Sequence, residues 1–157
     1  MNLILKQTTK KDLNQLFLYQ KDEISNQMAA FTAENPNDKE AYMDKWSKII
    51  ENPAINMQTI FMDDINIGSV LHFDMMGETN VSYWIDRKYW GKGIATNVLS
   101  LFLKKVGKRP LVGRTAFDNY GSQKVLTNCG FILSGKELEF ANARNKKIEE
   151  FIFKIED

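Results

Sequence analysis

Two glycines separated by one residue, Gly91 and Gly93, are the positions of this chain best suited to bind an anion. They follow an apolar segment that ends at Ile85 and precede the run Ile94-Ala95-Thr96, which begins a helical pattern. Consecutive backbone N–H groups can face one ligand in such a loop, and the first turn of the next helix adds unsatisfied N–H groups and the positive end of its dipole. The stretch from Trp84 to Thr96 therefore predicts a phosphate-binding loop.

Two common phosphate-binding motifs do not fit this loop. A Walker A loop needs Ser or Thr after Gly-Lys, whereas Gly91-Lys92 is followed by Gly93. A dinucleotide-binding fingerprint needs a third glycine three residues after the second, and Thr96 stands there. The spacing therefore excludes a Walker A loop and a dinucleotide-binding loop. The alternative to a phosphate-binding loop is a tight turn before a helix that binds no ligand.

Length and composition limit the class of protein. The 157 residues, with a net charge of +1 and 43% hydrophobic residues, predict one domain over residues 1–157. The balanced charge gives no indication of nucleic-acid binding, and no apolar run approaches the ~20 residues that span a bilayer. One cysteine and one histidine argue against a metal site or a disulfide framework, and with the absence of a signal-peptide pattern they favour the cytoplasm.

The elements that position the loop follow from hydrophobic periodicity. The sequence predicts strands over residues 3–7, 55–61, 65–73, 81–85, 111–117, 131–140 and 148–155. Helices are expected from residue 9 onwards and over residues 38–52, 94–107 and 119–128, with residues 25–37 irregular. This order predicts an α/β fold with a mixed sheet.

Three ordered motifs resemble the GNAT superfamily of N-acetyltransferases, specifically its Rim-type branch, named for enzymes that acetylate ribosomal proteins. Trp90-Gly91-Lys92-Gly93-Ile94-Ala95-Thr96 is similar to the pyrophosphate loop of that branch. Asn119-Tyr120-Gly121-Ser122 is similar to its Asn-x-x-Ser helix start, and Val125 to Phe131 to its helix-end Gly-Phe signature. The branch often has an aromatic residue where the wider superfamily has Gln or Arg, which accounts for Trp90.

The resemblance implies a GNAT fold and a reaction. We expect a mostly antiparallel central sheet that splays between two parallel strands, with helices on both faces. Acetyl-CoA would be the co-substrate, without a metal, and its acetyl group would pass by direct attack to a primary amine. That acceptor would be a protein N-terminus, a lysine or a small-molecule amine. A non-catalytic acyl-CoA-binding or regulatory domain is the alternative, and a homodimer is compatible with the sequence.

The resemblance also implies which residues bind the donor and act on it. The expected CoA contacts are Trp84, Ile85, Asp86, Trp90, Gly91, Lys92, Gly93, Ile94, Ala95, Thr96, Asn119 and Ser122. A backbone N–H near Trp84 or Ile85 would stabilise the oxyanion.

The proton-transfer groups are less well defined. Leu126 stands where many superfamily members have an acidic tyrosine, so Ser122 is the candidate proton donor, or else only a helix-start residue beside the cofactor. Glu78 is the first candidate for the general base, and Glu34, His72 and a water chain are alternatives. Cys129 is expected to be a small buried residue rather than a nucleophile.

Overall fold

The computed structural model of the chain describes residues 2–157. Seven strands form one sheet in the order β1-β2-β3-β4-β5-β7-β6. Every neighbouring pair is antiparallel except β4 and β5, which run parallel. The strands are β1 (Leu3–Gln7), β2 (Asn56–Met62), β3 (Ile65–Met75), β4 (Glu78–Ile85), β5 (Leu111–Ala116), β6 (Ile132–Ala141) and β7 (Lys146–Ile155).

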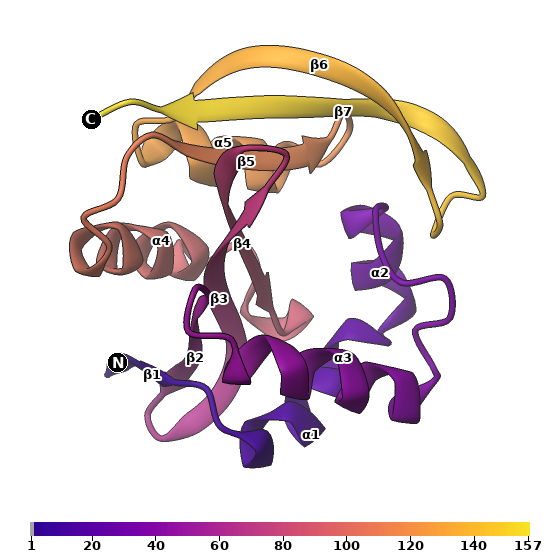
Figure 1. Cartoon of the computed structure of the whole chain (residues 1–157), viewed down its shortest axis with the longest axis vertical. Coiled ribbons are helices and arrows are strands. Elements are labelled where there is room, and N and C mark those ends of the chain that lie inside the picture. The colour runs from indigo at the N-terminus through magenta and orange to yellow at the C-terminus, as the bar shows by residue number, and fades with distance from the viewer. Residues whose placement is uncertain (1) are drawn as a thin grey trace.

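The helices cover both faces of this sheet (Figure 1). They are α1 (Lys10–Gln20), α2 (Glu23–Ala29), α3 (Lys39–Glu51), α4 (Ile94–Lys105) and α5 (Tyr120–Asn128), with a 3-10 turn η1 (Arg87–Tyr89) after β4. Leu13 and Leu16 of α1 bury Met57 and Leu71 of the sheet on one face, hereafter the α1 face. On the opposite face, the α4 face, α4 and Leu126 of α5 pack on a larger core.

Side chains alternate between these faces along β4, so their placement can be followed by residue number. Tyr83 lies opposite Val70 and shares its α4-face core, whereas Ser82 lies opposite Leu71 on the α1 face. Trp84 also faces α1, because its indole Nε1 donates to the carbonyl oxygen of Tyr19 at 3.3 Å. Even-numbered residues of β4 therefore point to the α1 face and odd-numbered residues to the α4 face.

The two parallel strands separate after a short contact. Their register contains only Asn80 opposite Val112 and Val81 opposite Gly113. β4 continues to Ile85 and β5 to Ala116 without further pairing between them. This open wedge is hereafter the slot, and it confirms the expected mixed sheet that splays between two parallel strands.

The expectation of irregular chain over residues 25–37 is wrong for its first part, because α2 runs from Glu23 to Ala29. Asp22 caps this helix by accepting from the backbone N–H of Ser25 at 3.1 Å. The two residues that α2 buries, Ser25 and Asn26, are polar, and the Asn26 side chain donates to the carbonyl oxygen of Gln20 at 2.8 Å. Hydrophobic periodicity cannot reveal a helix that buries polar groups.

Candidate active site

The glycine loop lies between the end of β4 and the start of α4. Gly91 and Gly93 have φ of 72° and 76°, and Gly93 is the N-cap of α4. A Cβ placed on either glycine would meet no atom within 4 Å, so the space above the loop is open. Left-handed backbone, open space and the first turn of a 12-residue helix together fit an anionic group such as a pyrophosphate.

The backbone of β4 presents two amides to the slot. The N–H of Asp86 donates to the carbonyl oxygen of Ile67 at 2.8 Å, so Asp86 is paired with β3. Backbone direction alternates along an antiparallel strand, so Trp84 also faces β3, whereas Tyr83 and Ile85 face the slot. Of the three β4 residues expected to contact the donor, only Ile85 offers its backbone there, and Tyr83 offers a second amide that the sequence did not predict.

Trp90 fixes the connection between β4 and the glycine loop. Its indole Nε1 donates to the carbonyl oxygen of Ile85 at 2.9 Å, which leaves the N–H of Ile85 as that residue's slot-facing group. Lys92 has its Nζ 5.8 Å from the centroid of the Tyr89 ring, beside the loop. Ile94, the first residue of α4, is buried, so it contributes its backbone to the loop and its side chain to the core.

The start of α5 lies across the slot from Tyr83. Asn119 is the N-cap of α5, and its Oδ1 accepts from the N–H of Ser122 at 3.2 Å. The hydroxyl groups of Ser122 and Tyr83 are 2.7 Å apart and share a hydrogen bond. The structure therefore brings together the predicted Asn119 and Ser122 with Tyr83, for which the sequence predicts no acid or base role.

A charged cluster on the α1 face centres on Arg114 of β5. Its Nη1 lies 3.2 Å from a carboxylate oxygen of Glu137 and 3.2 Å from one of Glu150. Its Nε donates to Asn80 at 3.3 Å, and its Nη2 lies 3.6 Å from Glu78. Burial raises the pKa of Glu150, whose side chain is only 13% exposed, although the neighbouring Arg114 opposes this shift.

Glu150 lies level with the slot. It is opposite Ala116 on β5, and the register of Val81 with Gly113 places Ala116 level with Trp84 on β4.

The sequence did not predict that Arg114, Glu137 and Glu150 form one group. Alternation could have revealed Glu150, because it lies between Ile148 and Ile152, two buried residues on the same face of β7.

The predicted base candidates lie in three different places. Glu78 is on the α1 face at the start of β4, where it also pairs with Lys154 at 3.5 Å. It is seven residues from Ile85, about 23 Å along a strand. His72 is on the α4 face with its ring centroid 6.1 Å from that of Phe102, and burial lowers its pKa. His72 and Glu78 therefore lie on opposite faces of the sheet.

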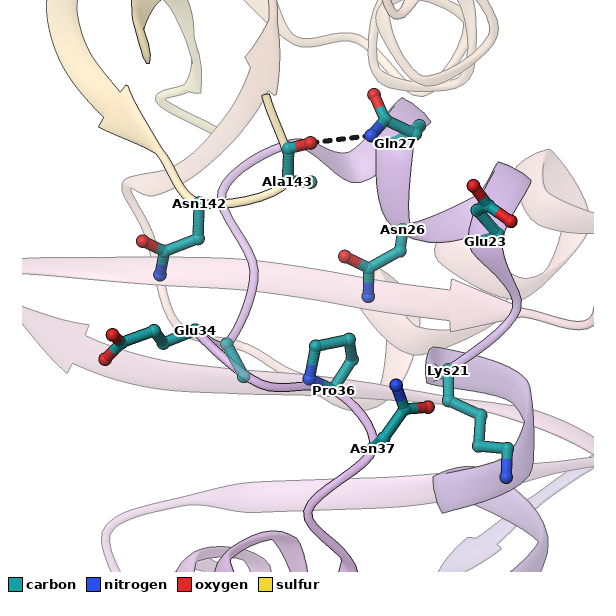
Figure 2. Close-up of a pocket in the computed structure, with 10 residues that line it drawn as sticks. Lys21, Glu23, Asn26, Gln27, Glu34, Pro36, Asn37, Asn142 and Ala143 are labelled. Atoms are coloured by element: carbon teal, nitrogen blue, oxygen red, sulfur yellow. Dashed lines mark hydrogen bonds between the residues drawn. The ribbon is translucent and has the colours of Figure 1, made fainter. Parts of the chain in front are cut away.

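The third candidate, Glu34, lines a cavity of about 360 Å³ between α2, the loop after it and the tip of the β6–β7 hairpin. Figure 2 shows this cavity and the hydrogen bond from Gln27 to the carbonyl oxygen of Ala143, at 2.6 Å. The hairpin tip also binds Asp118, because Arg144 donates two hydrogen bonds of 2.9 Å to that carboxylate. Residues 25–37 and 141–145 are thus brought together over the α1 face.

Comparison with known proteins identifies the family. The family model described as an acetyltransferase (GNAT) domain matches residues 2–132. The chain therefore belongs to the GNAT family of acetyltransferases, as its motifs predict. No curated protein matches the sequence.

Solved structures share the fold at low sequence identity. A GNAT superfamily phosphinothricin acetyltransferase from Sinorhizobium meliloti, in complex with acetyl-CoA, is 16% identical with a TM-score of 0.83, over 99% of this chain and 89% of that one. An N-acetyltransferase from Staphylococcus aureus is 19% identical with a TM-score of 0.81, over 99% of both chains. A ribosomal-protein alanine acetyltransferase from Vibrio fischeri is 14% identical with a TM-score of 0.76, over 99% and 93%. Both Rim-type and other acetyltransferases are thus similar, and the Rim-type branch stays a prediction.

Two further findings concern partners. Residues 2–157 contain no helix that is long and apolar enough to cross a membrane. In the same residues, no group of three or more His, Cys, Asp and Glu side chains is arranged to hold a metal ion.

Proposed function

We propose that the protein transfers the acetyl group of acetyl-CoA to a primary amine by direct attack in the slot between β4 and β5. The observation that carries this proposal is the slot itself, which opens beyond Val81 and Gly113 and has the glycine loop at its end. A phosphate site next to unpaired strand backbone suits a ligand with a pyrophosphate and an amide-containing arm. CoA has both.

The donor binds along the α4 face and the slot. The loop from Gly91 to Thr96 holds the pyrophosphate with backbone N–H groups, and Lys92 adds a positive charge. The arm of CoA pairs with the slot-facing backbone of Tyr83 and Ile85, as an added strand does. The Nδ2 of Asn119 is available to this arm because its Oδ1 caps α5. The related structure from Sinorhizobium meliloti, which contains acetyl-CoA, supports this assignment.

The reacting carbonyl lies against the slot-facing amides. When the amine attacks, the carbonyl oxygen becomes negative and accepts from the N–H of Ile85 or that of Tyr83. Ser122 lies on the opposite side of the slot, where its hydroxyl can donate to the sulfur as the thiolate leaves. The thiol of CoA resembles that of cysteine, with a pKa of ~8.5, so its thiolate can leave without a strong acid.

Glu150 is the group that we place nearest to the amine on the α1 face. It is level with the slot, and Arg114 holds its carboxylate. The raised pKa suits a group that must accept a proton near neutral pH. Because Glu150 is one strand beyond β5, a water molecule relays the proton, which retains the predicted water chain. Glu78 is paired with Arg114 and Lys154 and contributes to the charge of this face.

The amine enters from the α1 face, between the charged cluster and the α2–hairpin cavity. Ser82 supports this route, because it is exposed although it lies in the middle of the central strand β4. A protein N-terminus, a lysine and a small-molecule amine all fit an open approach of this kind. The cytoplasm remains the expected location because of the single cysteine.

Acetyl-CoA binding and turnover test the proposal together. We expect acetyl-CoA to raise the melting temperature of the protein, and a panel of amines to release free CoA thiol. Gly93→Val places a side chain over the loop and should weaken acetyl-CoA binding at least tenfold. Gly77→Val is the matched control, because Gly77 also has a left-handed backbone, with φ of 79°, and open space around it, but lies in the turn between β3 and β4 at the far end of β4.

Three outcomes separate the alternatives. Binding with turnover supports the transferase. Binding without turnover on any amine supports the non-catalytic acyl-CoA-binding domain. Unchanged affinity in Gly93→Val, with native circular dichroism, contradicts the assignment of the loop.

A further inference from the structure

The side chain of Tyr83 forms a hydrogen bond with Ser122, the residue proposed to donate to the sulfur. Its phenol oxygen lies 2.7 Å from the Oγ of Ser122, and either oxygen can be the donor. Tyr83 comes from β4, and Ser122 from the first turn of α5, which follows β5. The hydrogen bond therefore joins the two strands that separate at the slot, on the α4 face.

The position of Tyr83 along β4 is also informative. The β4–β5 register ends at Val81 opposite Gly113, so Tyr83 is the first residue beyond it whose backbone faces the slot. Its side chain points to the α4 face, where the glycine loop and α5 lie. A donor that pairs with this backbone places its thioester beside the Tyr83–Ser122 contact.

The helix α5 supplies no acid of its own at this level. Leu126, one turn after Ser122, is 3% exposed and packs against Gly113. A Cβ added to Gly113 would lie 2.6 Å from the Cδ2 of Leu126. Burial is the main cause that raises the pKa of Tyr83 to about 12; the hydrogen bond with Ser122 opposes this shift, and the Cys129 thiol adds a smaller upward contribution. Tyr83 is consequently protonated at neutral pH and has a proton to donate to Ser122.

We propose that Tyr83 is a positioning residue that orients the Ser122 hydroxyl toward the thioester sulfur, so that Ser122 donates a hydrogen bond to the leaving thiolate. This inference rests on the proposed function. When the tetrahedral intermediate collapses, the C–S bond breaks and its electron pair goes to sulfur, while the amide C=O forms again. The phenol donates to Ser122 Oγ, so the serine O–H no longer points at Tyr83 and can turn to the sulfur.

Hydrogen bonding, rather than complete proton transfer, follows from the acidities. The pKa of Tyr83, about 12, is well above the ~8.5 of a leaving thiol. Transfer of the phenol proton through Ser122 would leave a tyrosinate that is far more basic than the thiolate. The thiolate therefore leaves as an anion held by Ser122, and solvent supplies its proton as CoA departs.

The test uses CoA alone and needs no acceptor. The pKa of the bound CoA thiol is measured from the ultraviolet absorbance of the thiolate, in the original protein and in Tyr83→Phe and Ser122→Ala. A hydrogen bond to a charged acceptor is strong enough to lower this pKa by about one unit. A shift of that size means that the protein binds the thiolate form of CoA about tenfold more tightly than the thiol form. We expect Ser122→Ala to remove this preference and Tyr83→Phe to remove most of it. The double variant should resemble Ser122→Ala, because the two residues act as one unit.

Two controls isolate the effect. Tyr42→Phe removes a phenol hydroxyl from a tyrosine that packs on the α1 face, and should leave the thiol pKa unchanged. Desulfo-CoA, which lacks the sulfur, should bind equally to the original protein and to Tyr83→Phe. Loss of desulfo-CoA affinity in Tyr83→Phe would show a packing role and overturn the inference.

Failure of this inference is distinguishable from failure of the proposed function. If the original protein does not bind CoA, the proposed function is wrong. If it binds CoA but the thiol pKa equals that of free CoA, or is the same in Tyr83→Phe, then Tyr83 does not position Ser122.

Discussion

Replacing Arg114 with Met tests whether the charged cluster depends on one largely buried ion pair, between Arg114 and Glu150. Arg114 and Glu150 are each 13% exposed at the side chain, whereas Glu137 and Glu78 are 43% and 36% exposed. Exposed pairs contribute little, so most of the cost comes from leaving Glu150 without its partner. Breaking a buried pair in this way costs about 3–5 kcal/mol, and we expect the lower end because both side chains retain some solvent contact.

The loss should depend on pH in a defined direction. Burial already holds the pKa of Glu150 above its unfolded value, and removal of Arg114 raises it further. A carboxyl group of this kind favours the folded state below its unfolded pKa, near ~4.3, and loses that contribution as pH rises through the folded pKa. Arg114→Met should therefore cost more free energy of unfolding at pH 7 than at pH 4.

Urea unfolding of the original protein and the variant at both pH values measures this difference. Glu150→Gln is the matched background, because it removes the charge and keeps the shape. In that background, Arg114→Met should cost about 1 kcal/mol or less. An equal loss at pH 4 and pH 7, or an equal loss with Gln at position 150, would refute the assignment of the cost to the Glu150 carboxylate.

Three further changes have expected outcomes. Asp118→Asn should lower the free energy of unfolding by about 1 kcal/mol at pH 7, since Arg144 holds the pKa of that carboxyl below its ordinary value; a loss that persists in urea unfolding below pH 3 would contradict this. Trp90→Phe should weaken acetyl-CoA binding about fivefold in calorimetry by removing the donor to the Ile85 carbonyl, and unchanged affinity would show that this hydrogen bond does not set the loop. Leu99→Ala should cost about 3 kcal/mol in urea unfolding, because Leu99 of α4 is fully buried in the core between this helix and the sheet, and a loss below about 1 kcal/mol would mean that the core refills.

The glycine loop before α4 and the cap of α5 were predictable because their signals are local in sequence. Gly91 and Gly93 lie next to the helix that they begin, and Asn119 lies three residues before the N–H that it caps. Residues that act through backbone conformation or a helix cap reveal themselves within a few positions. The sequence also predicted the seven strands, because their apolar residues alternate or run continuously.

The charged cluster on the α1 face was not predictable, and the reason is physical. The cluster at Arg114 joins β4, β5, β6 and β7, and its members lie up to 72 positions apart. Apart from Glu150, which lies between two buried isoleucines on its face of β7, each of these charged residues alone resembles an ordinary surface charge. Only the sheet order, which places β7 between β5 and β6, brings Glu137 and Glu150 to one arginine. The polar helix α2, which closes this side, was missed because it buries Ser25 and Asn26 rather than an apolar stripe.

The strand β4 explains why the α4-face half of the candidate site could be predicted from the sequence and the α1-face half could not. Its odd-numbered residues face the glycine loop and α5, and its even-numbered residues face α1 and the charged cluster. The donor half is therefore completed by segments that directly follow β4 and β5, whereas the α1-face half needs β6, β7 and α2. In the proposed reaction, the thioester is reached from the α1 face while its sulfur stays on the α4 face, and the gap beyond Val81 is where both halves meet. Tyr83 lies in that gap with its amide toward the slot and its phenol toward Ser122, so a single residue can serve both the carbonyl and the sulfur.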